Sequence, residues 1–247
     1  MTNSFPKRKH IGVRAVAPSI ITILALAAGL TSLKFSLADK WELAVFAIIF
    51  AGILDGLDGT LARLLKSASR FGAELDSLAD MVNFGVAPAV LIYHWKLEAL
   101  GGLGWVIALS FAICCALRLA RYNSALDGED EPRRKAGFLT GFPAPVGATL
   151  ALIPLTIEFE YGPGFFSNSY VVGATTALIA LGMVSRVPTF SMKQLIIPRE
   201  QMVPFLLGVG LLAATITVYG WIVLIGGATL YLALVPVSIL KFRRMKR

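Results

Sequence analysis

The sequence predicts an all-α polytopic membrane protein, and three observations support this class. Of 247 residues, 56% are hydrophobic and only 15% are charged, whereas a soluble domain carries about 25% charged residues. Apolar stretches of about 20 residues, the length that crosses a hydrocarbon core, recur along almost the whole chain. These stretches are continuous rather than alternating, so the pattern favours helices over strands.

About eight membrane-spanning helices are expected, in a single domain that covers residues 1–247. The first has a basic start that imitates a signal peptide, but further spans follow and we interpret it as an uncleaved helix. Only Tyr219-Gly220 separates the last two. The expected spans are residues 15–33, 42–65, 72–95, 103–125, 142–160, 170–187, 201–217 and 219–240.

The distribution of lysine and arginine predicts the orientation. The net charge is +8, and most positive residues fall in the two ends and in alternate loops. The segments assigned to the outer side hold only Lys34, Lys40 and Lys96. Cytoplasmic segments carry an excess of positive charge, so both termini are predicted to be cytoplasmic, in the cell (inner) membrane. The basic residues then suit anionic membrane lipids, and nucleic acid is not an expected partner.

Four aspartates interrupt the apolar pattern in the second and third spans. Asp55 and Asp58 are three residues apart, and Asp76 and Asp80 are four apart, so each pair lies on one helical face. A short turn between the spans would bring the two pairs together. A charge inside a bilayer costs at least about 2.5 kcal/mol, and four neighbouring carboxylates repel one another unless a cation neutralises them. Oxygen ligands suit one or two Mg²⁺ or Mn²⁺ ions.

Helix capping and ion pairs with the nearby basic residues are the structural alternative. Either would explain one or two of the aspartates, but not four on matched faces. The small residues Gly59 and Ala62 leave the surface of the second span low, so that another helix or a flat ligand can approach.

The segment from Asp55 to Asp80 resembles the signature of the CDP-alcohol phosphatidyltransferase family. It reads DGLDGTLARLLKSASRFGAELDSLAD and contains every fixed position of the pattern D-x2-D-G-x2-A-R-x8-G-x3-D-x3-D. The resemblance implies that an alcohol attacks the β-phosphate of a CDP-linked lipid and that CMP leaves. It also implies that Asp55, Asp58 and Asp76 bind divalent metal, and that Asp80 completes this site and acts as general base.

The same resemblance implies a pocket for the CDP group. In the first span, Pro18 and Thr22 match a Pro-Asn-x-x-Thr stretch of the family, and Ser19 stands where the family has Asn. The residues implied to bind the CDP-lipid are Pro18, Ser19, Thr22, Gly59, Ala62, Arg63, Ser69 and Gly72. The chemistry agrees, because displacement at a pyrophosphate needs charge neutralisation and a base near the attacking hydroxyl.

The acceptor alcohol is predicted from other stretches. Phe84–Ala89, Leu117–Asn123 and Gly141–Ala148 resemble the bacterial phosphatidylserine synthase branch of the family, with CDP-diacylglycerol as donor. Arg118 and Arg121 lie three apart on one face, with Asn123 beyond. A guanidinium group can bind a carboxylate through two hydrogen bonds, so these three residues are predicted to bind L-serine. As the alternative, both arginines anchor the helix at the membrane surface or bind lipid phosphate.

Other acceptors and another function class are alternatives. Glycerol 3-phosphate or inositol phosphate would need more free positive charge than the loop at 126–141 offers, because its acidic residues nearly cancel its basic ones. Choline would need an aromatic cage, whereas Tyr93, Trp95 and Trp105 are expected toward the outer side. An ion-coupled transporter would need polar groups that form a path to the outer face, and the outward portions of these spans have almost none. A homodimer is implied by the resemblance alone.

Overall fold

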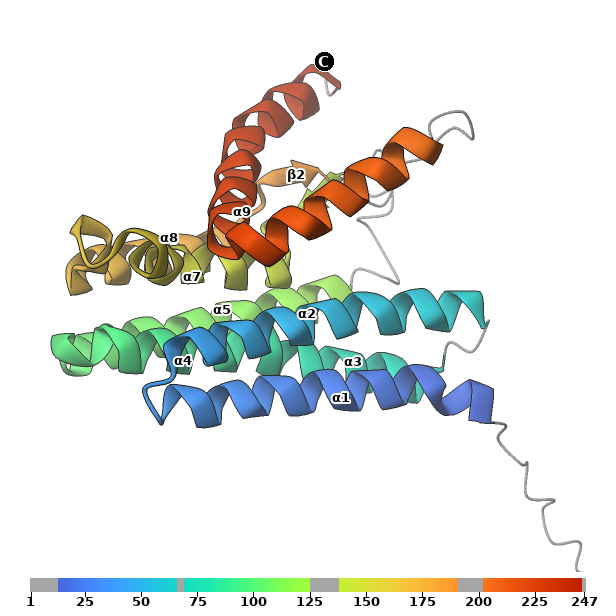
Figure 1. Ribbon diagram of the computed structural model, residues 1–247, viewed down its shortest axis with the longest axis horizontal. Coiled ribbons are helices and arrows are strands. Elements are labelled where there is room, and N and C mark those ends of the chain that lie inside the picture. Colours follow the sequence, from blue (N-terminus) through green and yellow to red (C-terminus); the bar gives the residue numbers. More distant parts are fainter. Residues whose placement is uncertain (1–12, 66–68, 125–137, 191–201, 246–247) are drawn as a thin grey trace, which may run out of the picture.

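The computed structural model describes residues 13–65, 69–124, 138–190 and 202–245, which are almost entirely helical (Figure 1). The helices and strands are α1 (Val13–Ser36), α2 (Trp41–Leu64), α3 (Arg70–Asp80), the π-helix η1 (Met81–Val86), α4 (Ala87–Trp95), η2 (Leu97–Leu100), α5 (Gly102–Ser124), β1 (Phe138–Thr140), α7 (Ala144–Tyr161), η4 (Phe165–Ser167), α8 (Ser169–Val184), β2 (Pro188–Phe190) and α9 (Met202–Met245).

Several of these helices have the length and apolar character of membrane spans. Within the described residues, five segments are long and apolar enough to cross a bilayer, and the helix Ser169–Val184 is apolar but shorter. The five are Val16–Ser36, Trp41–Leu64, Arg70–Trp95, Gly102–Ser124 and Val218–Phe242. They coincide within a few residues with five of the expected spans. The chain is therefore an all-α polytopic membrane protein.

The last two expected spans form one helix with a kink. In α9 the backbone at Tyr219 leaves the helical region, with φ −126° and ψ 44°. The two arms diverge from this point as a V, and the described C-terminal end lies at the tip of one arm (Figure 1). The break thus falls at Tyr219-Gly220, where the sequence placed the boundary between residues 201–217 and 219–240.

The third expected span is not a uniform α-helix. Directly after Asp80 the backbone adopts a π-helical turn, η1, before α4 continues to Trp95. A π-helix is rare and is often found at functional sites. Within η1, Asn83, Phe84 and Gly85 are buried, so the turn packs into the bundle immediately beyond the last aspartate.

A short antiparallel strand pair departs from the expected absence of strands. Residue Phe138 of β1 pairs with Phe190 of β2, and Thr140 pairs with Pro188. Each strand has only three residues and lies outside the apolar stretches, so neither could be detected as a run of alternating polarity. The pair joins the segment before α7 to the segment after α8.

The core lies mainly where α4, α5, α7 and α8 meet. Phe84, Leu91, Phe111, Leu155 and Met183 belong to this cluster and are almost completely buried. On the other side of the bundle, α1 packs along α2 and also contacts α3, η1 and α4. This packing brings the first three helices together, and the aspartates lie on two of them.

Candidate active site

Three of the four aspartates converge between α2 and α3. A carboxylate oxygen from each of Asp55, Asp76 and Asp80 lies within 4.8 Å of the other two, and all three side chains are partly buried. Asp80 lies directly against Asp55. Its Oδ1 atom is buried and has no hydrogen-bond partner among the described residues. Because a buried polar atom is normally paired, this orphaned oxygen beside two other carboxylates fits a hard divalent cation.

Asp58 has a different environment from the other three. Its side chain is buried, with 4% of its surface exposed. Its Oδ2 atom accepts a hydrogen bond from the Thr22 hydroxyl of α1 at 2.5 Å, and that hydroxyl also lies 3.1 Å from the carbonyl oxygen of Pro18. The structure therefore groups Asp55, Asp76 and Asp80 and ties Asp58 to α1.

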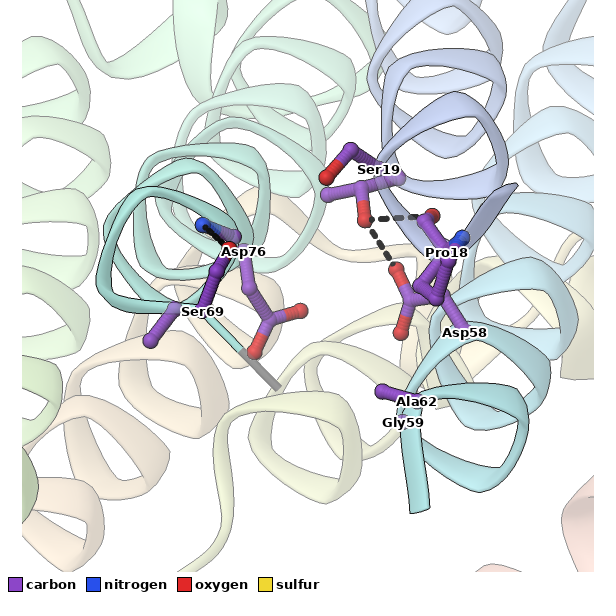
Figure 2. Close-up of a pocket in the computed structure, with 10 residues that line it drawn as sticks. Pro18, Ser19, Asp58, Gly59, Ala62, Ser69 and Asp76 are labelled. Carbon is purple, nitrogen blue, oxygen red and sulfur yellow. Dashed lines mark hydrogen bonds between the residues drawn. The ribbon is translucent and has the colours of Figure 1, made fainter. Parts of the chain in front are cut away.

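A pocket of about 140 Å³ opens beside these aspartates, between α1, α2 and the start of α3. Figure 2 shows Asp58 and Asp76 on opposite walls, with their carboxylates directed into the space between them. The lining consists of Pro18, Ser19, Thr22, Asp58, Gly59, Ala62, Ser69, Gly72, Ala73 and Asp76. All the residues predicted to bind the CDP group are in this set except Arg63.

The N-terminus of α3 forms one wall of the pocket. Ser69 is the N-cap, and its Oγ atom accepts a hydrogen bond from the backbone N–H of Gly72 at 3.0 Å. Serine is favoured there because it satisfies an otherwise unpaired N–H group. A Cβ atom at Gly72 would lie 3.1 Å from the Ser69 Oγ and 3.6 Å from the Ser19 Oγ. Because Gly72 has no side chain, this wall of the pocket does not extend toward Ser69 and Ser19. The N-terminal end of the helix also favours binding of a negatively charged group.

Arg63 lies outside the pocket lining. Its side chain is exposed and folds back along α2, where Nε donates to the carbonyl oxygen of Gly59 at 3.0 Å and Nη2 to the Thr60 hydroxyl at 3.4 Å. It lies one turn after Gly59, a pocket residue. In this conformation, the guanidinium group is held by its own helix.

The three residues predicted to bind serine have separate environments. The Arg118 guanidinium lies within electrostatic reach of Asp80, and its central carbon is 5.6 Å from the centre of the Tyr122 ring. Arg121 Nη1 donates to the carbonyl oxygen of Val184, at the end of α8, at 2.7 Å. Asn123 Nδ2 donates to the Ser77 hydroxyl of α3 at 2.8 Å. Arg118 is thus near Asp80 of the carboxylate cluster, and Asn123 contacts the residue that follows Asp76.

Sequence reasoning missed further residues around the site. Ala73 lines the pocket, and its position was detectable, because Ser69, Gly72, Ala73 and Asp76 follow the i, i+3, i+4, i+7 spacing of one helical face. Tyr231 of α9 lies within electrostatic reach of Arg118. Nothing in its own apolar stretch indicates this, because the approach depends on how α9 packs.

The comparison with protein families agrees with the motif. The sequence profile described as CDP-alcohol phosphatidyltransferase matches residues 15–187, which include both the pocket and the carboxylate cluster. This match covers more than half of the chain. The chain belongs to the CDP-alcohol phosphatidyltransferase family.

Three similar curated proteins of this family have the same name. A CDP-diacylglycerol–serine O-phosphatidyltransferase of Mycobacterium leprae is 35% identical over 239 residues, which are 97% of this chain and 79% of the relative. The protein of the same name from Mycobacterium tuberculosis H37Rv is 40% identical over 74% of this chain and 64% of its own length, slightly less than two thirds. That of Methanocaldococcus jannaschii is 38% identical over 67% of this chain and 69% of the relative.

Proposed function

We propose that this protein transfers a phosphatidyl group from CDP-diacylglycerol to the hydroxyl of L-serine, in a metal-dependent reaction that yields phosphatidylserine and CMP. One observation carries the proposal: Asp76 belongs both to the pocket lining and to the group of three close carboxylates. A nucleotide in the pocket would therefore place its phosphates beside the carboxylates. Membership of the family supports the transfer reaction, and the names of the relatives support serine as the acceptor.

The four aspartates would hold one or two divalent ions. A bound Mg²⁺ or Mn²⁺ ion would supply neutralisation of the negative charge on the pyrophosphate. Asp55, Asp76 and Asp80 are within 4.8 Å of one another, and Asp58 faces Asp76 across the pocket (Figure 2). The Thr22 hydroxyl would hold the Asp58 carboxylate in position through their hydrogen bond.

The pocket would bind the CDP group of the lipid. Gly59, Ala62 and Gly72 line the pocket and would leave room for it, and Ser69 at the start of α3 would face its phosphates. Arg63 would contribute only by turning away from Gly59 and Thr60, which its side chain contacts at present. The complete proposed set is Pro18, Ser19, Thr22, Gly59, Ala62, Arg63, Ser69 and Gly72.

Asp80 would act as the general base. It would take the proton of the serine hydroxyl, whose oxygen then forms a bond to the β-phosphorus. The bond between this phosphorus and the bridging oxygen breaks, and CMP leaves with the electron pair. Arg118 beside Asp80 would bind the serine carboxylate and so bring the hydroxyl toward its base. Arg121 and Asn123 would complete the acceptor side.

The site would lie in the inner membrane and face the cytoplasm. Asp58 lies near the end of α2 and Asp76 in the following helix, on either side of the basic segment between them. If both termini are cytoplasmic and the single domain has eight spans, as predicted, the end of α2 and the start of α3 would lie at the inner surface. The CDP-lipid would then enter from the inner leaflet and serine from the cytoplasm. A homodimer is part of the same proposal.

An assay of the purified full chain tests the proposed function. The protein in detergent, with CDP-diacylglycerol and Mn²⁺ or Mg²⁺, is given L-serine, glycerol 3-phosphate, inositol phosphate or choline. We expect CMP release and a phosphatidylserine product with L-serine, and loss of both when a chelator removes the metal. A different lipid product would overturn the acceptor assignment, and absence of CMP release with every alcohol would overturn the transferase itself.

Exchange of labelled CMP distinguishes direct attack from a covalent intermediate. Without serine, direct attack gives no incorporation of labelled CMP into CDP-diacylglycerol. Rapid incorporation under these conditions would show that a phosphatidyl-enzyme forms first.

A further inference from the structure

Tyr231 lies in the second arm of α9, beyond the residues 15–187 that the family profile matches. Its ring packs edge-on against that of Phe142, with centroids 5.9 Å apart and planes at 77°. One helical turn before it, Ala228 is buried, and seven residues after it, the Ser238 hydroxyl donates to the carbonyl oxygen of Pro188 in β2 at 2.8 Å. The face of α9 that carries Tyr231 is therefore packed inward against β2 and the segment before α7.

The hydroxyl of Tyr231 is buried without a partner. It lies beside Thr189, whose hydroxyl donates to the carbonyl oxygen of Gly141 at 2.9 Å and keeps its acceptor capacity. The two hydroxyls nevertheless do not meet the geometry of a hydrogen bond. The Tyr231 oxygen is inaccessible to solvent and forms no hydrogen bond with any residue that the structure describes. A buried hydroxyl without a partner is unfavourable, and tyrosine usually finds one when buried. The described residues therefore leave the hydrogen-bonding capacity of this hydroxyl unused.

Arg118 identifies the kind of ligand that would fit. The guanidinium is within electrostatic reach of both Tyr231 and Asp80, so it is near both the hydroxyl and the carboxylate cluster. A guanidinium and a phenolic hydroxyl are both hydrogen-bond donors, and together they match the oxygens of a carboxylate. Asp80, the proposed base, interacts with the same guanidinium.

We propose that Tyr231 is an acceptor-binding residue whose hydroxyl, with Arg118, binds the carboxylate of the amino-acid acceptor. This inference rests on the proposed function and extends the acceptor site to α9. It makes Tyr231 a determinant of specificity, because a site with paired donors discriminates against an alcohol that lacks the carboxylate. Asp80 acts on the hydroxyl end of serine, and Tyr231 and Arg118 hold the opposite end.

The variant Tyr231→Phe tests the proposal without disturbing the ring contact with Phe142. Tyr219→Phe is the matched control, because it removes a hydroxyl from the same helix at a residue that is 55% exposed. Initial rates of the full-length variants are measured against L-serine and against CDP-diacylglycerol. We expect Tyr231→Phe to raise the KM for L-serine by about ten- to a hundred-fold, the range for a hydrogen bond to a charged group. The KM for CDP-diacylglycerol should stay at the wild-type value. The thermal midpoint should not fall, because the variant removes a buried hydroxyl that has no partner. Tyr219→Phe should leave both KM values and the thermal midpoint at the wild-type values.

Each outcome of this experiment bears on one inference. An unchanged KM for L-serine in Tyr231→Phe overturns the role of Tyr231. Equal rises in the two KM values, or a lowered thermal midpoint, also overturn it and make Tyr231 a packing residue. If wild-type protein forms no phosphatidylserine at all, the proposed function fails, and that result is read from the wild type alone.

Discussion

The pocket that we propose for the nucleotide and the acceptor side that we propose for serine are built from different kinds of contact. The pocket comes from three consecutive helices, and its lining runs from Pro18 to Asp76. The acceptor side brings together α5, the end of α8, β2 and α9, which are far apart in the sequence. Asp80 belongs to both regions, because it interacts with Asp55 and with Arg118.

This difference separates what each region depends on. The pocket is held by local features, such as the Ser69 cap on α3 and the Thr22 to Asp58 hydrogen bond between neighbouring helices. The acceptor side depends on tertiary packing, because Arg121 reaches the end of α8 and Ser238 reaches β2. If the proposed roles are correct, changes in α5 and α9 would alter the binding of the acceptor and leave the proposed nucleotide pocket intact.

Loss of the proposed base, Asp80, should have the largest effect, because both substrates are proposed to react beside it. We expect Asp80→Asn to lower kcat by about 10³-fold or more, within the range of general-base contributions. The KM values for serine and CDP-lipid should change far less, and the protein should elute and melt as wild type. Asp39→Asn is the control, since Asp39 is exposed in a turn with φ 55°, a conformation that asparagine tolerates. Full activity in Asp80→Asn would refute the base assignment.

Loss of a proposed metal ligand should distinguish the role of the carboxylate cluster from the role of the pocket. Asp55→Asn and Asp76→Asn remove one of three close carboxylates, and each should weaken Mn²⁺ binding about a hundred-fold or more, because a first ligand matters at least as much as its supporting groups. Binding is measured by electron paramagnetic resonance of free Mn²⁺, independently of turnover. Only Asp76 also lines the pocket, so Asp76→Asn alone should raise the KM for CDP-lipid at saturating metal. Unchanged Mn²⁺ affinity in both variants would contradict the metal site.

Replacement of Arg118 and of Arg121 in α5 should have different effects, although the sequence predicts the same role for both. Arg118→Ala should raise the KM for serine about ten- to a hundred-fold, because a charge-assisted hydrogen bond is lost, with a smaller effect on the CDP-lipid. Arg121→Ala should raise it less and should also lower the thermal midpoint, because its contact with the Val184 carbonyl is lost. Steady-state kinetics and thermal unfolding of both variants measure this difference. Equal effects on the two substrates would favour the membrane-anchor interpretation of these arginines.

Much of the pocket could be predicted because helical periodicity determines which of its residues lie together. The spacing from Asp55 to Asp80 determines which residues share a face of α2 and of α3, and the structure brings nearly all the predicted pocket residues together. Arg63 is the exception, because the direction of a long exposed side chain is not determined by spacing. The position of the α9 kink could be predicted as well, from Tyr219-Gly220 between two apolar stretches.

The remaining features depend on contacts between distant segments. The π-helical turn after Asp80, the β1–β2 pair and the approach of Tyr231 to Arg118 have no local pattern in the sequence. The separate environment of Asp58 is of the same kind, because it depends on the position of α1 against α2. Periodicity predicts that Asp55 and Asp58 share a face, but not that one meets α3 and the other meets Thr22.

The smallest expected effect concerns the hydrogen bond between Thr22 and Asp58 in the pocket. Thr22→Val removes the hydrogen bond to Asp58 but preserves the shape of the side chain, and it should raise the KM for CDP-lipid about ten-fold, the lower range for a hydrogen bond to a charged group. Thr31→Val is a matched control on the same helix. Both hydroxyls lie near the carbonyl oxygen four residues earlier, of Pro18 and of Ala27 respectively, but only that of Thr22 reaches an aspartate.

Because the helix-internal contact is common to both variants, the difference between their KM values isolates the Thr22 to Asp58 contact. The KM for serine should stay at the wild-type value in both, since the acceptor side has no contact with α1 through this hydroxyl. A rise in the KM for serine with Thr22→Val would mean that Asp58 acts on both substrates. The pocket and the acceptor side would then share Asp58 as well as Asp80.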